Sequence, residues 1–167
     1  LLRISKMKFF DPACGSGNFL IIAYKELRKL EIDIWKRRTE LTGEHVVPFT
    51  NININQFYGI EIDSFAHEVA MLSLWLAEHQ MNMLFTKEFA DVKLDALPLE
   101  NIDTIVQGNA CRIDWDTVCP HTAEEEVFIF GNPPYLGSKL QSIEQKNDLK
   151  SVFEDLTERR KNNLDYI

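Results

Sequence analysis

Hydrophobic and polar residues alternate along this chain with two different periods, and these periods predict strands and helices in turn. Short apolar-rich runs bounded by turn residues predict strands at residues 7–10, 57–62, 104–107 and 127–130. Apolar residues three and four positions apart predict an amphipathic helix at 20–34 and another helix at 64–82. A polar helix is expected at 142–162, whereas residues 84–101 have no clear period and are expected to be irregular.

This order of elements favours a single α/β domain. When strands alternate with helices, right-handed crossovers produce a largely parallel sheet that helices cover on both faces. The chain has 167 residues, of which 45% are hydrophobic, and this is enough for one packed core. Residues 1–167 are therefore interpreted as one domain.

Composition excludes several classes of protein. The cysteines (Cys14, Cys111 and Cys119) form no Cys-x-x-Cys pair, and the histidines show no metal-ligand spacing, so neither a disulfide framework nor a metal site is expected. No apolar run approaches the roughly 20 residues that span a bilayer, and no signal peptide is visible, which favours a reducing cytoplasm and no membrane. The net charge of −8 argues, taken alone, against a nucleic-acid partner, because phosphate contacts need Lys and Arg.

The first candidate site follows the first predicted strand. Two glycines stand between this strand and the next helix, in the run Asp11-Pro12-Ala13-Cys14-Gly15-Ser16-Gly17-Asn18-Phe19. Such a turn brings bare backbone to the carboxyl edge of the sheet, where open α/β sheets bind ligands. The third glycine of a dinucleotide-binding loop is absent, which favours a cofactor without phosphates. Taken alone, Gly-x-Gly indicates a plain strand–helix turn equally well.

Two further motifs end predicted strands. Glu61 stands where an acidic residue accepts hydrogen bonds from ribose hydroxyls, and Ile62 can cover one face of an adenine. A carboxylate at this point can instead cap the following helix, a role that Asp63 or Ser64 could also take. After the third strand, the side-chain amide of Asn109 could bond an adenine amino group, although Gly-Asn is also a common turn.

The fourth motif, Asn132-Pro133-Pro134-Tyr135, follows the last predicted strand and is the most specific of the set. Two consecutive prolines hold the backbone rigidly and donate no hydrogen bonds. They therefore present the Asn132 side-chain oxygen and the Pro133 carbonyl as two acceptors, with an aromatic ring beside them. Two acceptors and a ring suit a flipped-out base that carries an exocyclic amino group. Accepting bonds from both N–H groups draws the amine nitrogen toward tetrahedral geometry and stabilises the charge that develops during methyl transfer.

These four motifs, in this order, resemble those of the N6-adenine DNA methyltransferase family, and most closely its bacterial restriction–modification type. The resemblance extends over residues 7–167 and implies the Rossmann-like fold of S-adenosylmethionine-dependent methyltransferases, with the first four strands of a partial parallel sheet present here. It implies that S-adenosylmethionine is bound by Asp11, Pro12, Ala13, Gly15, Gly17, Phe19, Glu61, Ile62, Asn109 and Ala110. It also implies that a target adenine is held by the catalytic residues Asn132, Pro133, Pro134 and Tyr135. Asn109 departs from the Asp that this family often has at the same point.

The same resemblance implies double-stranded DNA as the partner, with the target adenine flipped out. The connections at 39–56 and 83–103 are too short for a DNA-recognition domain, so we expect that domain beyond residue 167 and the basic surface that binds DNA outside this chain. An endonuclease, fused or associated, would also lie outside this chain. Two alternatives stay open: a methyltransferase of an RNA base or of protein glutamine, and a non-catalytic nucleic-acid-binding subunit that retains the fold.

Overall fold

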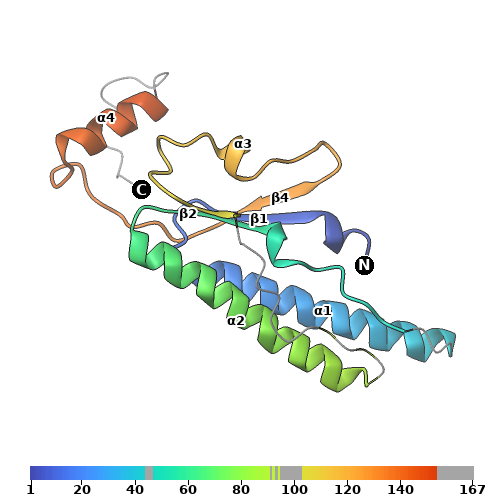
Figure 1. Cartoon of the computed structure of the whole chain (residues 1–167). Coiled ribbons are helices and arrows are strands. Elements are labelled where there is room, and N and C mark those ends of the chain that lie inside the picture. Colours follow the sequence, from blue (N-terminus) through green and yellow to red (C-terminus); the bar gives the residue numbers. More distant parts are fainter. Residues whose placement is uncertain (44–46, 91, 93, 95–102, 154–167) are drawn as a thin grey trace.

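The computed structural model describes the chain except for residues 44–46, 91, 93, 95–102 and 154–167. In the described part, four strands form one parallel sheet in the order β3-β2-β1-β4 (Figure 1). These strands are β1 (Met7–Asp11), β2 (Phe57–Glu61), β3 (Ile105–Gln107) and β4 (Glu126–Ile129). Each strand begins and ends within one residue of the predicted range, so the parallel α/β sheet is confirmed.

Capping residues set the ends of two helices. The first long helix, α1 (Asn18–Thr42), extends beyond the predicted 20–34 and ends where Gly43 adopts a left-handed conformation, with φ of 65°. The helix near the end of the described chain, α4 (Ile143–Val152), begins at a capping box in which the side chains of Ser142 and Gln145 accept each other's backbone N–H. The predicted helix at 142–162 is thus confirmed up to Val152, and its last part lies outside the described residues.

The second long helix, α2 (Ser64–Glu88), continues beyond its predicted end. The expectation of irregular backbone was therefore wrong for residues 84–88, and most of 91–101 lies outside the described residues. Tertiary packing explains the extension, because the Phe85 side chain is fully buried and lies 5.6 Å from the Arg28 guanidinium of α1. In the part of the chain that the structure describes, no helix is long and apolar enough to cross a membrane.

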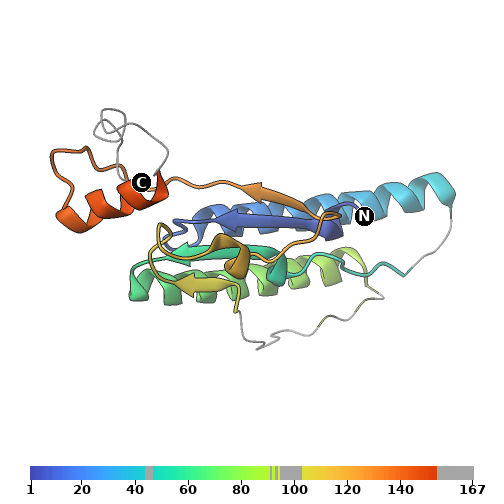
Figure 2. The same ribbon diagram turned by 90° about the horizontal axis from the view of Figure 1, so that it is seen from above.

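The helices cover the two faces of the sheet unequally. α1 and α2 lie side by side on one face, and the short α3 (Trp115–Val118), which was not predicted, lies on the other (Figures 1 and 2). Right-handed crossovers require this arrangement. The chain moves from β1 to β2 to β3 in one direction and then returns past β1 to β4, so the last crossover passes over the opposite face.

The pleat of the central strands divides the core in the same way. Phe9 and Phe57 point to the α1–α2 face, where their rings stack with centroids 5.0 Å apart. Phe10 and Ile60 point to the other face and pack with Val118 of α3. Both central strands are therefore buried on both faces, which fixes the position of the backbone where they end.

The reversal of strand order creates the position for a site. β2 lies on one side of β1 and β4 lies on the other, so the strand order reverses at β1. A crevice opens at such a switch point, and open α/β sheets bind their ligands there. The first and fourth motifs follow the two strands that form this switch point.

Candidate active site

A cleft of about 460 Å³ lies at the carboxyl ends of the strands. All four sequence motifs contribute to its lining, which consists of Pro12, Ala13, Gly15, Ile60, Glu61, Ile62, Gly108, Asn109, Ala110, Asn132, Pro133, Pro134 and Tyr135. The strands are parallel, so segments separated by up to a hundred or so residues reach the same edge. The cleft is therefore a single site assembled from four strand ends.

Hydrogen bonds join the turn after β1 to the end of β2. The Gly15 N–H donates to Glu61 Oε2 at 2.7 Å, and the Cys14 N–H donates to the Ile60 carbonyl at 3.0 Å. Gly15 has a φ of 56°, a conformation that side chains with a Cβ rarely adopt. Burial raises the pKa of the Cys14 thiol to about 12, so this cysteine stays neutral. The turn thus has a fixed shape on this side of the cleft.

Asp63, and not Glu61, takes the helix-capping role that the sequence left open. Asp63 caps α2, because its Oδ1 accepts the Ala66 N–H at 2.8 Å. Glu61 faces the cleft, and its Oε1 accepts the Asp63 N–H at 2.9 Å while Oε2 accepts Gly15. A carboxylate has about four sites for incoming hydrogen bonds, so Glu61 can accept ribose hydroxyls in addition to these two N–H groups.

Asp11 lies beneath the cleft rather than in its lining, with only 1% of its surface exposed. Its Oδ1 accepts the Ala13 N–H at 3.0 Å, and its Oδ2 has no hydrogen-bond partner among the described residues. Burial raises the pKa of the Asp11 carboxyl; the bond from Ala13 opposes this shift, and the negative charge of Glu61 adds to it. Two neighbouring carboxylates repel phosphate and attract a cationic ligand.

The fourth motif begins next to the first motif, just after Gly131. A Cβ added to Gly131 would lie 2.5 Å from Asp11 Oδ1, so the chain can pass this point only without a side chain. The Phe130 N–H donates to the Phe10 carbonyl at 3.0 Å and continues the pairing of β4 with β1. The Asn-Pro-Pro-Tyr segment consequently starts directly beside the glycine turn.

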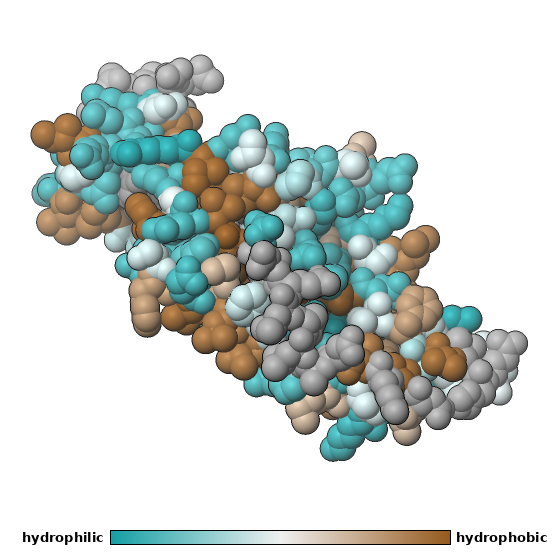
Figure 3. All heavy atoms as spheres, viewed as in Figure 1, coloured by the Kyte–Doolittle hydropathy of each residue, from teal (hydrophilic) through white to brown (hydrophobic). Residues whose placement is uncertain are grey.

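Beyond Gly131 the fourth motif is open to solvent. Asn132 is exposed and the Tyr135 side chain is 68% exposed, although both line the cleft. A bond of 2.8 Å from Gln141 Nε2 to the Leu136 carbonyl holds the loop that leads to α4. Leu140 and Ile143 are also exposed, and Figure 3 shows hydrophobic side chains at this end of the molecule.

Asn109 occupies the β3 side of the cleft with both ends of its amide engaged. Its Oδ1 accepts the Cys111 N–H at 2.9 Å, and its Nδ2 donates to Asp148 Oδ2 of α4 at 3.0 Å. The sequence did not indicate Asp148. The only available signal was an acidic residue in a polar helix, and such residues usually face solvent.

Three predicted cofactor residues lie outside the lining of the cleft. Asp11 supports it from below, whereas Gly17 serves helix packing, since a Cβ at this position would lie 3.3 Å from Ala70 Cβ of α2. Phe19 is 47% exposed on α1, with its ring centroid 6.3 Å from that of Phe130. Conversely, Ile60 and Gly108 line the cleft without having been predicted, and the position of Gly108 directly after a strand was the signal for it.

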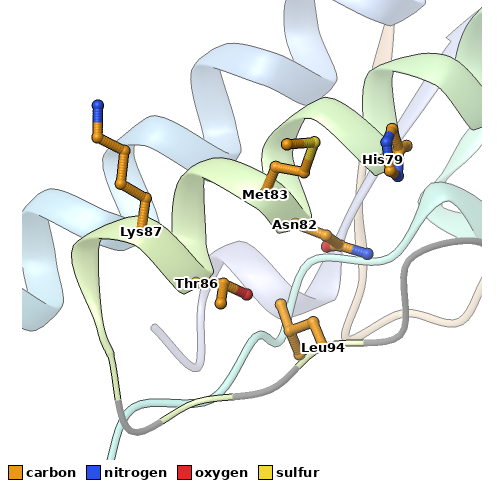
Figure 4. Close-up of a pocket in the computed structure, with 6 residues that line it drawn as sticks. All are labelled: His79, Asn82, Met83, Thr86, Lys87 and Leu94. Atoms are coloured by element: carbon orange, nitrogen blue, oxygen red, sulfur yellow. The ribbon is translucent and has the colours of Figure 1, made fainter.

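A second hollow of about 370 Å³ lies along α2, away from the strand ends (Figure 4). Its lining consists of His79, Asn82, Met83, Thr86, Lys87 and Leu94, and none of these belongs to a strand-end motif. Within the described ranges, no three His, Cys, Asp or Glu side chains gather into a group that could hold a metal ion. The cleft is thus the place where the chemically distinctive residues meet.

Comparison with known proteins identifies the family of this chain. The family model for the DNA-methyltransferase domain of MmeI matches residues 1–167. DNA methyltransferase A of Bacillus subtilis (strain 168) is 55% identical over 168 residues, which cover 100% of this chain and 19% of that protein. A protein of Methanocaldococcus jannaschii, whose name combines a type II restriction enzyme with a methyltransferase, is 31% identical over 68% of this chain and 9% of its own length.

A solved structure gives the same result in three dimensions. The type IIL restriction-modification enzyme MmeI, determined in complex with DNA, superposes with a TM-score of 0.83 and 41% identity, over 99% of this chain and 22% of that one. The chain therefore spans about a fifth of the length of these two relatives, MmeI and DNA methyltransferase A. On the strength of the full-length match, the fold and the cleft, this chain belongs to the MmeI-type DNA-methyltransferase domain family.

Proposed function

We propose that this domain binds S-adenosylmethionine and transfers its methyl group to the N6 amino group of an adenine flipped out of double-stranded DNA. The observation that carries the proposal is that the four strand-end motifs line one cleft. One side of this cleft offers carboxylates and bare backbone for a nucleoside cofactor, and the other offers Asn-Pro-Pro-Tyr for a base. Transfer needs both ligands in the same cleft.

The residues present fit this cofactor. Glu61 would hold the ribose hydroxyls, Ile62 would cover the adenine, and Gly15 would leave room for the methionine end. S-adenosylmethionine carries a positive sulfonium and a positive ammonium, which suit a site with Asp11 and Glu61 close together. A dinucleotide pyrophosphate would meet the same two negative charges without a lysine or arginine among the lining residues to offset them.

The bound cofactor supplies an electrophilic methyl group, and the residues after β4 supply the receptor for the amine. Asn132 Oδ1 and the Pro133 carbonyl accept the two N–H groups of the target amine, and the Tyr135 ring stacks on the base. The amine nitrogen is a poor nucleophile because its lone pair is delocalised into the ring. Two acceptors would favour the tetrahedral nitrogen and stabilise the positive charge on it while the new nitrogen–carbon bond forms and the methyl–sulfur bond breaks, which releases S-adenosylhomocysteine. The methylated amine would then lose one proton to solvent.

Binding of DNA itself belongs to the rest of the protein in this proposal. The chain carries a net charge of −8, whereas phosphate contacts require cationic surface. The relative MmeI was solved with DNA and is a restriction-modification enzyme, which supports a recognition domain and an endonuclease elsewhere in the same polypeptide.

The direct test uses the full-length protein, double-stranded DNA and S-adenosylmethionine labelled in the methyl group. The labelled DNA is digested to nucleosides, and the modified base is identified by mass spectrometry. We expect N6-methyladenine. Labelling of cytosine would refute the adenine assignment. Transfer to RNA or to protein, with none to DNA, would favour the alternative methyltransferases, and failure to bind the cofactor at all would favour a non-catalytic subunit.

A further inference from the structure

Asp148 connects α4 to the β3 side of the cleft. Its carboxylate is buried, with 7% of the residue exposed, although it belongs to a predominantly polar helix. Besides the bond from Asn109, Oδ1 accepts Arg112 Nε at 2.8 Å and Oδ2 accepts Arg112 Nη2 at 3.2 Å. The carboxylate is therefore oriented by a forked bond from one arginine while it accepts the amide of a cleft residue.

The bonds to Asn109 fix which end of its amide is which. The NH₂ group donates to the Asp148 carboxylate, and the oxygen accepts the Cys111 N–H. A flipped amide would place its oxygen against the carboxylate and its NH₂ against an N–H donor, so both contacts would become repulsive. Two independent neighbours thus impose the same orientation.

We propose that Asp148 is a positioning residue that locks the Asn109 oxygen as an acceptor and so makes the cofactor site selective for a purine with a 6-amino group. This inference rests on the proposed cofactor. An amide oxygen can accept two hydrogen bonds, so Asn109 Oδ1 can serve Cys111 and an adenine amino group together. A 6-oxo purine would present a second oxygen to it instead.

The same contact accounts for an amide rather than a carboxylate at position 109. An Asp at this position would place a second carboxylate oxygen about 3.0 Å from Asp148 Oδ2, the distance at which the amide nitrogen now lies. Like charges at that distance disfavour each other strongly. Asn109 and Asp148 therefore form one unit, in which the first contacts the cofactor and the second determines its orientation.

The test compares S-adenosylhomocysteine with its 6-oxo analogue S-inosylhomocysteine by isothermal titration calorimetry on the full-length protein. We expect the wild type to prefer the adenosyl compound by about tenfold or more, the factor typical of one unpaired buried polar group. Asp148→Ala should reduce this ratio at least threefold, because only the Cys111 N–H then opposes the flipped amide, whose NH₂ group can donate to a 6-oxo group. Asp148→Asn keeps an acceptor and should restore the preference.

Arg112→Gln is the matched control, since it removes the arginine that Asp148 contacts and leaves the bond to Asn109 in place. This variant should keep the wild-type ratio of affinities for S-adenosylhomocysteine and S-inosylhomocysteine. An unchanged ratio in Asp148→Ala would overturn the positioning role while leaving the cofactor proposal intact. If the wild type bound neither compound, the cofactor proposal would fail, and this inference with it.

A second measurement does not depend on removing the Asp148 side chain. Asn109→Asp should weaken binding of S-adenosylhomocysteine about tenfold at neutral pH, because two carboxylates then face each other. The double variant Asn109→Asp with Asp148→Asn should recover most of this loss. Additive losses in the double variant would show that the two residues act separately and would contradict the proposal.

Discussion

The turn after β1 and the loop after β4 face each other across the switch point of the sheet, but they are constructed differently. The turn is tied to the end of β2 through Glu61, which accepts two backbone N–H groups, and it rests on the buried Asp11. The loop that carries Asn132 and Tyr135 is exposed, and its bond from Gln141 lies beyond the motif itself. One side of the cleft is therefore rigid before any ligand binds, whereas the other is open.

This difference matches the two tasks in the proposed reaction. A small cofactor of constant shape is best served by groups that are already in place, because no ordering cost is then incurred on binding. A base that must leave the DNA stack enters from solvent, so its receptor has to be accessible. Substitutions in the turn after β1 and at the end of β2 should therefore affect cofactor binding, whereas substitutions in the loop after β4 should affect methyl transfer.

The largest effect is expected from Asn132→Ala. Loss of one of two acceptors for the amine should lower the methyl-transfer rate by about 100-fold or more, the usual size for removal of one charge-stabilising group. Cofactor affinity should change less than about twofold, since the rigid side is untouched. Single-turnover transfer and calorimetric titration of the same preparation measure the two quantities. Equal losses of transfer rate and cofactor affinity would mean that the two sides of the cleft do not act separately.

Glu61→Ala should have the opposite effect, a loss of cofactor affinity with little change in the transfer rate at saturating cofactor. This change removes the proposed acceptor for ribose and leaves the N–H groups of Gly15 and Asp63 without the partner they have here, so cofactor affinity should fall about 10- to 100-fold. Transfer at saturating cofactor should recover most of its rate. Glu61→Gln keeps one side-chain oxygen, so its cofactor affinity should lie between those of the wild type and Glu61→Ala. A rate that stays low at saturation would assign Glu61 to the chemical step.

The pH dependence of stability and of cofactor affinity should reveal the contribution of Asp11. Its pKa is raised in the folded protein, so the folded state binds more protons than the unfolded chain just above the usual carboxyl pKa of about 3.8. Stability should therefore decrease as pH rises from this value through the raised pKa, and Asp11→Asn should remove that component. A cationic cofactor favours the ionised carboxyl, so its affinity should increase over the same range in the wild type. Thermal unfolding and titration at a series of pH values test both statements.

The smallest effect concerns an exposed side chain. Ile62 is 65% exposed at the cleft, so Ile62→Ala should leave stability within about 0.5 kcal/mol of wild type. It should still weaken cofactor binding a few-fold through lost contact with the adenine face. Ile129→Ala is the matched control, because Ile129 is 59% exposed on β4 and does not line the cleft. If both variants bound the cofactor with similar affinity, Ile62 would not be part of the cofactor site.

The strand-end motifs could be predicted because their signals are local. A short apolar run followed by Gly, Asp or Pro identifies a strand end, and parallel topology then brings all such ends to one edge. This is why residues as distant as Gly15 and Asn132 could be expected at the same edge of the sheet, and both line the cleft. The sequence allowed Asp63 to cap the second long helix, and its hydrogen bond from the Ala66 N–H confirms this role.

Other features depend on tertiary placement and have no local signal. α2 extends to Glu88 because Phe85 is buried against α1, and α3 is too short for a period to appear. Asp148 reaches Asn109 only because the chain returns across the carboxyl edge after β4. Gly17 was assigned to the cofactor by position, whereas the structure places it against α2.

Hydrogen–deuterium exchange on the full-length protein tests most directly whether the two sides of the cleft hold different ligands. The amides of Ala13, Cys14, Gly15 and Gly17 should be protected without ligand and further protected by S-adenosylhomocysteine alone. The amides of Asn132, Tyr135 and Leu136 should exchange quickly in both states and become protected only when target DNA is added. Protection of these amides by the cofactor alone, as strong as that in the turn after β1, would contradict the division of roles.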